Sequence, residues 1–168
     1  EYFVAKAKEL MGFGIDNLIV GDAPGTLTPE RTRTLIPALR CAIGKRIPLE
    51  LSSHGNTGLA GECYREAMAL GVDILHTAAL PLAYGESVPA TTDMVGVARD
   101  VGLEVEVNEQ RLKEIDDYFF WVSYQERKPI GRRVQFTPSE YEKYAAHQIP
   151  GGMISNLVNQ LSELGLLH

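Results

Sequence analysis

The residues best placed for chemistry stand in a polar loop, SSHGNTG at 52–58, that contains one imidazole. The loop follows a short apolar run and precedes a helix-like segment, and in α/β proteins this strand-to-helix junction is where active sites gather. His54 is the candidate for acid–base or metal chemistry. Ser52 and Asn56 carry hydroxyl and amide groups that could bind a small molecule. The same polar groups could equally satisfy the first N–H groups of the following helix.

Strand and helix patterns alternate around this loop. Apolar runs predict short buried strands, at 16–20, 47–51 and 72–77. Helical spacing predicts a first helix and one helix after each strand, at 2–11, 28–43, 59–70 and 89–102. Thr28 before Pro29 is a typical helix start, whereas Pro37 is expected to kink or shorten the same helix. Repeated strand–helix units indicate an α/β fold with a parallel sheet.

The pattern changes after Gly102. The segment LEVEV at 103–107 alternates in polarity and is either a strand or an extended link. We expect the rest to be a helix, an irregular stretch and a last amphipathic helix, at 108–126, 128–144 and 150–166. The chain therefore divides into a βα part, residues 1–102, and a mainly helical part, residues 103–168.

The predicted sheet is incomplete by itself. Its strands would leave two edges without hydrogen-bonding partners, and so few βα units cannot close an eight-stranded barrel. The sequence also starts at Glu1, without a methionine. We therefore expect a missing N-terminal half-barrel or a partner subunit to cover the edges, and an oligomer to form.

The composition is that of a soluble globular protein. Of the 168 residues, 45% are hydrophobic and 23% are charged, and the net charge is −6. This acidic balance argues against a surface for nucleic acid or anionic membrane, and no apolar run approaches the roughly 20 residues of a membrane span. Cys41 and Cys63 fall in predicted helices and are expected to be buried thiols in a reducing compartment, the cytoplasm.

Two other histidines and an aromatic run invite structural interpretations. His76 lies in a predicted strand with apolar neighbours, and His147 precedes a Pro-Gly-Gly turn whose loop it is expected to hydrogen-bond. Residues 118–121 are all aromatic and cannot all face one core from a helix. Part of this run is expected to cover a neighbouring element or an interface.

Three segments together resemble the carboxyltransferase domain of pyruvate carboxylase, the oxaloacetate decarboxylase α-subunit and transcarboxylase. They read DAPGTLTP, HGNTGLA and QIPGGMISNL, at 22–29, 54–60 and 148–157. They occur in the family's order and at about its spacing, and the likeness spans nearly all of the chain. The last segment is the most specific of the three.

The resemblance implies a (β/α)₈ TIM barrel in which residues 1–102 supply the later βα units and 103–168 form a helical post-barrel extension. It implies transfer of a carboxyl group between biotin and pyruvate, or decarboxylation of oxaloacetate onto biotin, with the biotin carried on a partner domain. In such a reaction a divalent metal polarises the keto oxygen and stabilises the enolate. The family's threonine proton shuttle falls outside this sequence, so no catalytic residue is assigned.

The resemblance also implies a metal set, and most of that set is absent. The family's metal-binding lysine falls on Gly21, and its H-x-H pair falls on Ser52 and His54. His54 is therefore the one matching ligand, and Asp22 could substitute as an oxygen ligand for zinc, manganese or cobalt. Asp22 could instead stabilise the turn before Gly25 by accepting hydrogen bonds from loop N–H groups.

These residues leave three hypotheses open. The first is a carboxyltransferase-like protein with an altered metal site that acts on a small 2-oxo acid. The second is a non-catalytic scaffold subunit that keeps the fold, which the losses at Gly21 and Ser52 favour. The third is another lyase- or aldolase-like barrel with its own chemistry, which fold alone would not distinguish.

Overall fold

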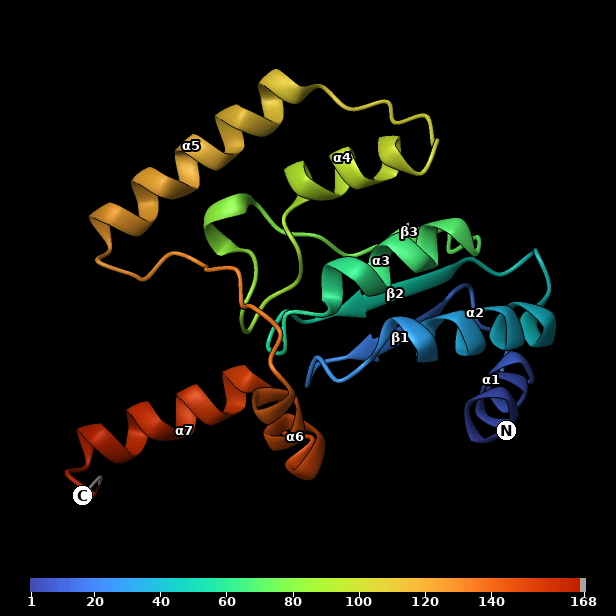
Figure 1. Cartoon of the computed structure of the whole chain (residues 1–168), viewed down its shortest axis with the longest axis horizontal. Coiled ribbons are helices and arrows are strands. Elements are labelled where there is room, and N and C mark those ends of the chain that lie inside the picture. The colour runs from blue at the N-terminus through green and yellow to red at the C-terminus, as the bar shows by residue number, and fades with distance from the viewer. Residues whose placement is uncertain (167–168) are drawn as a thin grey trace.

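A three-stranded parallel sheet in the order β1-β2-β3 lies at the centre of the molecule (Figure 1). The computed structural model describes residues 1–166. The strands are β1 (Leu18–Asp22), β2 (Leu49–Ser53) and β3 (Ile74–Leu75). The predicted parallel sheet is therefore confirmed, and β1 and β3 lie at its edges.

The helices of the βα part pack on one face of this sheet. They are α1, α2, α3 and α4, at Tyr2–Met11, Pro29–Ile43, Ala60–Ala69 and Thr91–Asp100, and a 3₁₀ turn, η1, spans Leu80–Leu82. The Thr28 hydroxyl accepts a hydrogen bond from Arg31 N at 3.2 Å, as expected for the start of α2. Pro37 does not shorten α2, which continues to its predicted end at Ile43. Pro37 lies on the solvent side, where water can satisfy the carbonyl that it leaves unbonded.

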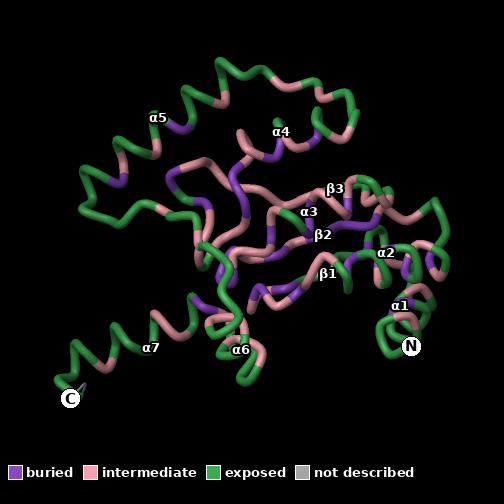
Figure 2. Tube along the Cα trace, viewed as in Figure 1, coloured by how far each residue is buried: buried purple, intermediate pink, exposed green. Residues whose placement is uncertain are grey.

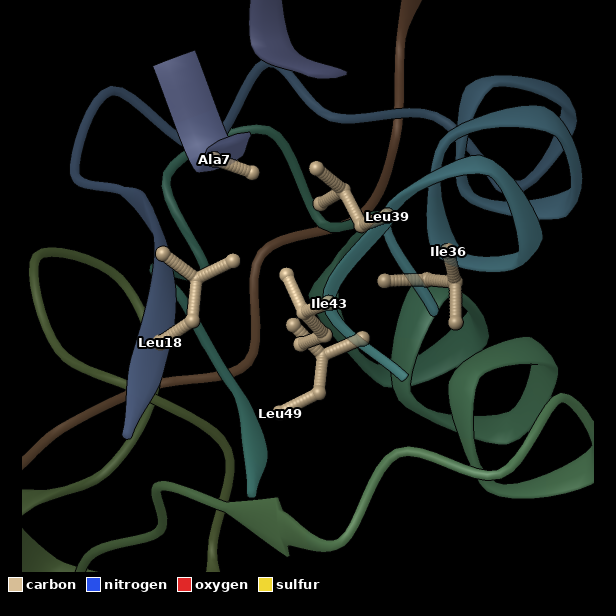
Figure 3. Close-up of a cluster of buried hydrophobic side chains, with 6 residues drawn as sticks. All are labelled: Ala7, Leu18, Ile36, Leu39, Ile43 and Leu49. Carbon is tan, nitrogen blue, oxygen red and sulfur yellow. The ribbon is translucent and has the colours of Figure 1, made fainter. Parts of the chain in front are cut away.

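The main core lies between the strands and the first two helices. Figure 3 shows Leu18 and Leu49 from the strands meeting Ile36, Leu39 and Ile43 of α2, with Ala7 of α1 beside them. Each large side chain buried here contributes about 1.5–3 kcal/mol relative to an exposed one. A second cluster contains Leu27, Leu51, Cys63, Tyr64, Ala67 and Met94. These clusters hold one face of the sheet against the helices.

The two cysteines differ in their surroundings. Cys63 is completely buried, its thiol donates to Leu27 O at 3.2 Å, and burial raises its pKa to about 12. Cys41 lies on the solvent face of α2 and is exposed. The prediction that both thiols are buried is therefore wrong for Cys41.

Strand β3 is shorter than the predicted 72–77. Before it, the Asp73 carboxylate accepts a hydrogen bond from Leu49 N at 2.8 Å and pairs with Arg40. A side chain thus satisfies a backbone donor that a longer strand would have satisfied through the ladder. After it, His76 N still donates to Leu51 O at 3.0 Å.

Residues 103–107 form an extended link, and three helices follow. They are α5, α6 and α7, at Glu109–Gln125, Pro138–His147 and Gly151–Glu163. The prediction of an irregular segment at 128–144 is wrong in its second half, where α6 begins. Thr137 caps α6 and Pro138 is its first residue, which is the same start signal that identified α2.

Helices α5 and α7 project from the same side of the molecule, and most of their surface is exposed (Figures 1 and 2). Tyr118, Trp121 and Tyr124 of α5 are exposed by 57%, 58% and 80%. Of the aromatic run 118–121, Phe119 alone is partly buried, and Tyr118, Phe120 and Trp121 stay exposed within residues 1–166. In the same residues, no helix is long and apolar enough to cross a membrane.

Helix α5 is anchored through Asp116, whose buried carboxylate accepts a hydrogen bond from Leu80 N at 2.7 Å. We expect Asp116→Ala to lower the free energy of unfolding by about 1–3 kcal/mol, because Leu80 N would lose its partner. The neighbouring Asp117 is exposed, so Asp117→Ala should stay within about 0.5 kcal/mol of the parent. Urea unfolding measures both, and equal losses would contradict the anchoring role.

Candidate functional site

The register of β1 and β2 decides which side chains share a face. Gly21 pairs with Ser52, and Asp22 pairs with Ser53. Because successive side chains alternate across a strand, Gly21 and Ser52 lie on the face away from the helices. Ile19 and Ile74, 48% and 45% exposed, lie on that same face. We call it the open face.

Asp22 points to the opposite side, and its carboxylate accepts three hydrogen bonds. One oxygen accepts from Thr26 N at 2.8 Å; the other accepts from Leu27 N at 3.0 Å and from the Ser53 hydroxyl at 2.7 Å. The side chain therefore holds the loop between β1 and α2, which is the alternative interpretation given above. These hydrogen bonds hold the carboxylate away from Gly21 and Ser52, which lie on the open face.

His54 lies directly after β2, at the carboxyl end of the sheet. Its backbone N donates to Asp22 O at 3.0 Å, which ties the two loops together. Its Nδ1 is buried and has no hydrogen-bond partner among the described residues. His54 is thus the one predicted ligand that offers a free ring nitrogen.

Asn56 links the segments that carry the family resemblance. Its Nδ2 donates to Ala23 O at 3.1 Å and to Pro24 O at 3.2 Å. Its Oδ1 lies against Gly151, at the start of α7, so closely that a methyl group on Gly151 would overlap it. The predicted substrate-binding residue is therefore 5% exposed and committed to holding loops. Ser52, in contrast, faces the open side and is only half-buried.

The helical extension lies over the loops at the carboxyl ends of the strands. Tyr141 of α6 donates its hydroxyl to Thr26 O at 3.2 Å, and Ser155 of α7 hydrogen-bonds the Glu86 carboxylate. Gly131 N donates to Pro81 O at 2.7 Å. His147 Nδ1 accepts from Ile149 N at 2.9 Å, as expected for a residue that stabilises this loop.

Sequence reasoning missed a polar group on the open face. Glu50 lies in the apolar run of β2, yet its carboxylate accepts from His76 Nε2 at 2.7 Å and from Asn17 Nδ2. These hydrogen bonds, that of His76 first, lower the pKa of Glu50. A glutamate between two leucines, in a run otherwise buried, was the available signal.

The residues of this corner do not by themselves fit a divalent ion. Gly21 and Ser52 supply neither carboxylate nor imidazole, and Asp22 is occupied. Across residues 1–166, no three His, Cys, Asp or Glu side chains gather closely enough to hold a metal. One imidazole beside a hydroxyl gives too few ligands for tight binding.

A cavity of about 500 Å³ lies beside the edge strand β1 instead, between α1, α2 and the extension. Gly21, Asp22, Arg31 and Gln148 are among its lining residues. Its apolar walls continue along the unpaired edge of the sheet, which is where a further βα unit would pack in a closed barrel.

The contact between Asn56 and Gly151 gives a test of how the motifs meet. Gly151→Ala should lower the free energy of unfolding by about 1–3 kcal/mol, because the added methyl group would displace Asn56. Gly152→Ala is the matched control, since its methyl group would meet only Glu86 Oε2, at 3.8 Å. Urea unfolding and hydrogen exchange in the 54–58 loop measure the effect; equal behaviour of the two variants would contradict it.

The lowered pKa of Glu50 predicts a pH dependence of stability. The unfolded state binds the Glu50 proton more readily than the folded state does. The stability that ionised Glu50 contributes is therefore present above the unfolded pKa of about 4.3, and it is lost as pH falls through the folded-state pKa. Glu50→Gln should therefore lose less stability on acidification below about pH 4.3 than the parent does. Glu142→Gln, at an exposed site on α6, is the control. Its free energy of unfolding, measured in urea at each pH, should change with pH as that of the parent does.

Known proteins resemble this chain over almost its full length, although no family model matches it. A pyruvate carboxylase subunit of Methanocaldococcus jannaschii is 34% identical over 99% of the chain and 29% of that protein. The 2-oxoglutarate carboxylase large subunit of Hydrogenobacter thermophilus is 32% identical over 98% and 25%, respectively.

The fold agrees with these relatives. The carboxyl transferase domain of Rhizobium etli pyruvate carboxylase, solved with pyruvate and biocytin, matches 98% of the chain with a TM-score of 0.79 and 28% identity. The chain covers 27% of that structure, so it spans about a quarter to a third of these proteins. The predicted resemblance is confirmed: the chain belongs to the carboxyltransferase family of pyruvate carboxylase and its relatives.

Proposed function

We propose that this chain forms the later βα units of a carboxyltransferase-like TIM barrel, residues 1–102, and the post-barrel extension, residues 103–168. The observation that carries the proposal is the meeting of the three family-like segments at the carboxyl ends of the strands. Asn56 contacts the first segment through Ala23 and Pro24 and the last through Gly151. In TIM barrels this end of the sheet carries the active site.

The substrate class follows from the relatives. Two of them are named for the carboxylation of pyruvate and of 2-oxoglutarate, which are both 2-oxo acids. We infer that the protein acts on a small 2-oxo acid, with biotin supplied by a carrier on a partner domain. Ser52, on the open face, is the better placed of the two predicted substrate-binding residues.

The metal site is altered in this proposal. Gly21 and Ser52 lie opposite each other at the positions of the family's lysine and first histidine, and His54 is left as the ligand from this chain. A segment outside the chain, such as the N-terminal half-barrel, would have to supply the other ligands. This half-barrel would also cover the exposed Ile19 and Ile74.

A non-catalytic scaffold is the second candidate, and the occupied carboxylate of Asp22 favours it together with Gly21 and Ser52. A scaffold needs the fold and the docking surfaces but no ion. It predicts a protein without bound metal or oxaloacetate decarboxylation that co-purifies with a catalytic or biotin-bearing partner.

Metal analysis of the full-length protein separates the two candidates. If the carboxyltransferase proposal is right, the protein should contain zinc, manganese or cobalt, and His54→Ala should lower its metal content by at least about tenfold. His147→Ala, on the exposed end of α6, should keep the metal. An active, metal-free protein would contradict the altered metal site, and an inactive, metal-free one would favour the scaffold.

A further inference from the structure

A carboxylate–imidazole pair lies on the open face, outside the three family-like segments. His76 Nε2 and Glu50 Oε2 are 2.7 Å apart, and Asn17 Nδ2 donates to the other carboxylate oxygen. The Glu50 side chain is 8% exposed, whereas that of His76 is 38% exposed. A buried carboxylate therefore holds an imidazole that solvent, or a ligand, can reach.

The backbone of His76 is held by hydrogen bonds at both its N–H and its carbonyl group. Its N donates to Leu51 O at 3.0 Å, and its O accepts from the Tyr64 hydroxyl at 2.6 Å. Tyr64 is completely buried, and its hydroxyl also accepts a hydrogen bond from Ser53 N at 3.2 Å. The ring thus stands on a rigid part of the sheet, as an acid–base group requires.

The position of His76 in the sheet is the second observation. Leu51 pairs with Leu75, so His76 continues the register opposite Ser52, and Ser52 pairs with Gly21. Gly21, Ser52 and His76 therefore form one row across the open face. The row contains the two positions at which the family's lysine and histidine are replaced.

The hydrogen bond sets the chemistry of the ring. A carboxylate accepts only, so Nε2 carries the proton and Nδ1 of the neutral ring keeps its lone pair. Among the described residues, Nδ1 has no hydrogen-bond partner. A histidine oriented by a carboxylate at one nitrogen is arranged to exchange a proton at the other.

We propose that Glu50 and His76 form an acid–base dyad that moves a proton to and from the carbon next to the keto group of a small 2-oxo acid. The C–H bond breaks, its proton goes to His76 Nδ1, and its electron pair forms the enolate as the carbonyl π pair moves to oxygen. Return of the proton reverses the step. The Ser52 hydroxyl, in the same row, is a donor for the enolate oxygen. The substrate class rests on the proposed function.

Exchange of the methyl protons of pyruvate for deuterium tests the dyad without biotin. The full-length protein is incubated with pyruvate in D₂O and followed by proton NMR. His76→Gln should slow exchange by at least about 100-fold, which is the low end for loss of general acid–base catalysis. Glu50→Gln should lower kcat with little change in KM, because Glu50 acts through His76. Glu142→Gln should exchange at the parental rate.

The outcomes separate this proposal from the proposed function. A parent protein that does not exchange the methyl protons would contradict the dyad, whereas the proposed function is tested separately by the metal content of the protein. Exchange that survives in folded His76→Gln would likewise contradict the dyad, and would leave Glu50 and His76 as a structural hydrogen-bonded pair. Ring nitrogen chemical shifts of the parent protein give a measurement that depends on no variant. They should show the proton of neutral His76 on Nε2, and a proton on Nδ1 would overturn the proposal.

Discussion

The parallel register of β1 and β2 is the constraint on which the rest of the structure depends. It places Gly21 beside Ser52 on the open face and Asp22 beside Ser53 on the other. A shift of one residue would exchange the two faces and send Leu49 and Leu51 away from the helices that bury them. The hydrophobic core therefore determines which polar side chains can meet at the candidate site.

The same constraint explains why the loops, rather than the strands, hold most of the hydrogen bonds at this end of the sheet. Asp22, which cannot point to the open face, satisfies the N–H groups of Thr26 and Leu27. Asn56 then hydrogen-bonds the loop after β1 from the loop after β2. Gly151 can lie against Asn56 because a glycine has no side chain. Each segment of the family resemblance thus has a packing role that requires no ligand.

Much of the fold could be predicted from the sequence, because apolar runs and helix start signals such as Thr28-Pro29 are local. The beginning of α6 was equally predictable from Thr137 and Pro138, but the surrounding polar residues obscured it. The role of Asp22 could be stated only as one of two alternatives, since a carboxylate beside a turn fits both. The pairing of Glu50 with His76 was not predictable, because the two residues are far apart in the sequence and meet only through the register of β2 and β3.

An incomplete set of candidate metal ligands and a hydrogen-bonded imidazole lie on the same face of this sheet. A metal site needs several ligands in one geometry, and Gly21 and Ser52 offer neither a carboxylate nor an imidazole. An imidazole needs only one oriented partner, and Glu50 provides it from the neighbouring strand. Since buried carboxylates are costly unless hydrogen-bonded, Glu50 would be a poor choice for a face whose only task was to pack against another half-barrel. The hydrogen-bonded Glu50, on a face that also holds Ile19 and Ile74, is therefore consistent with the proposed acid–base role of His76.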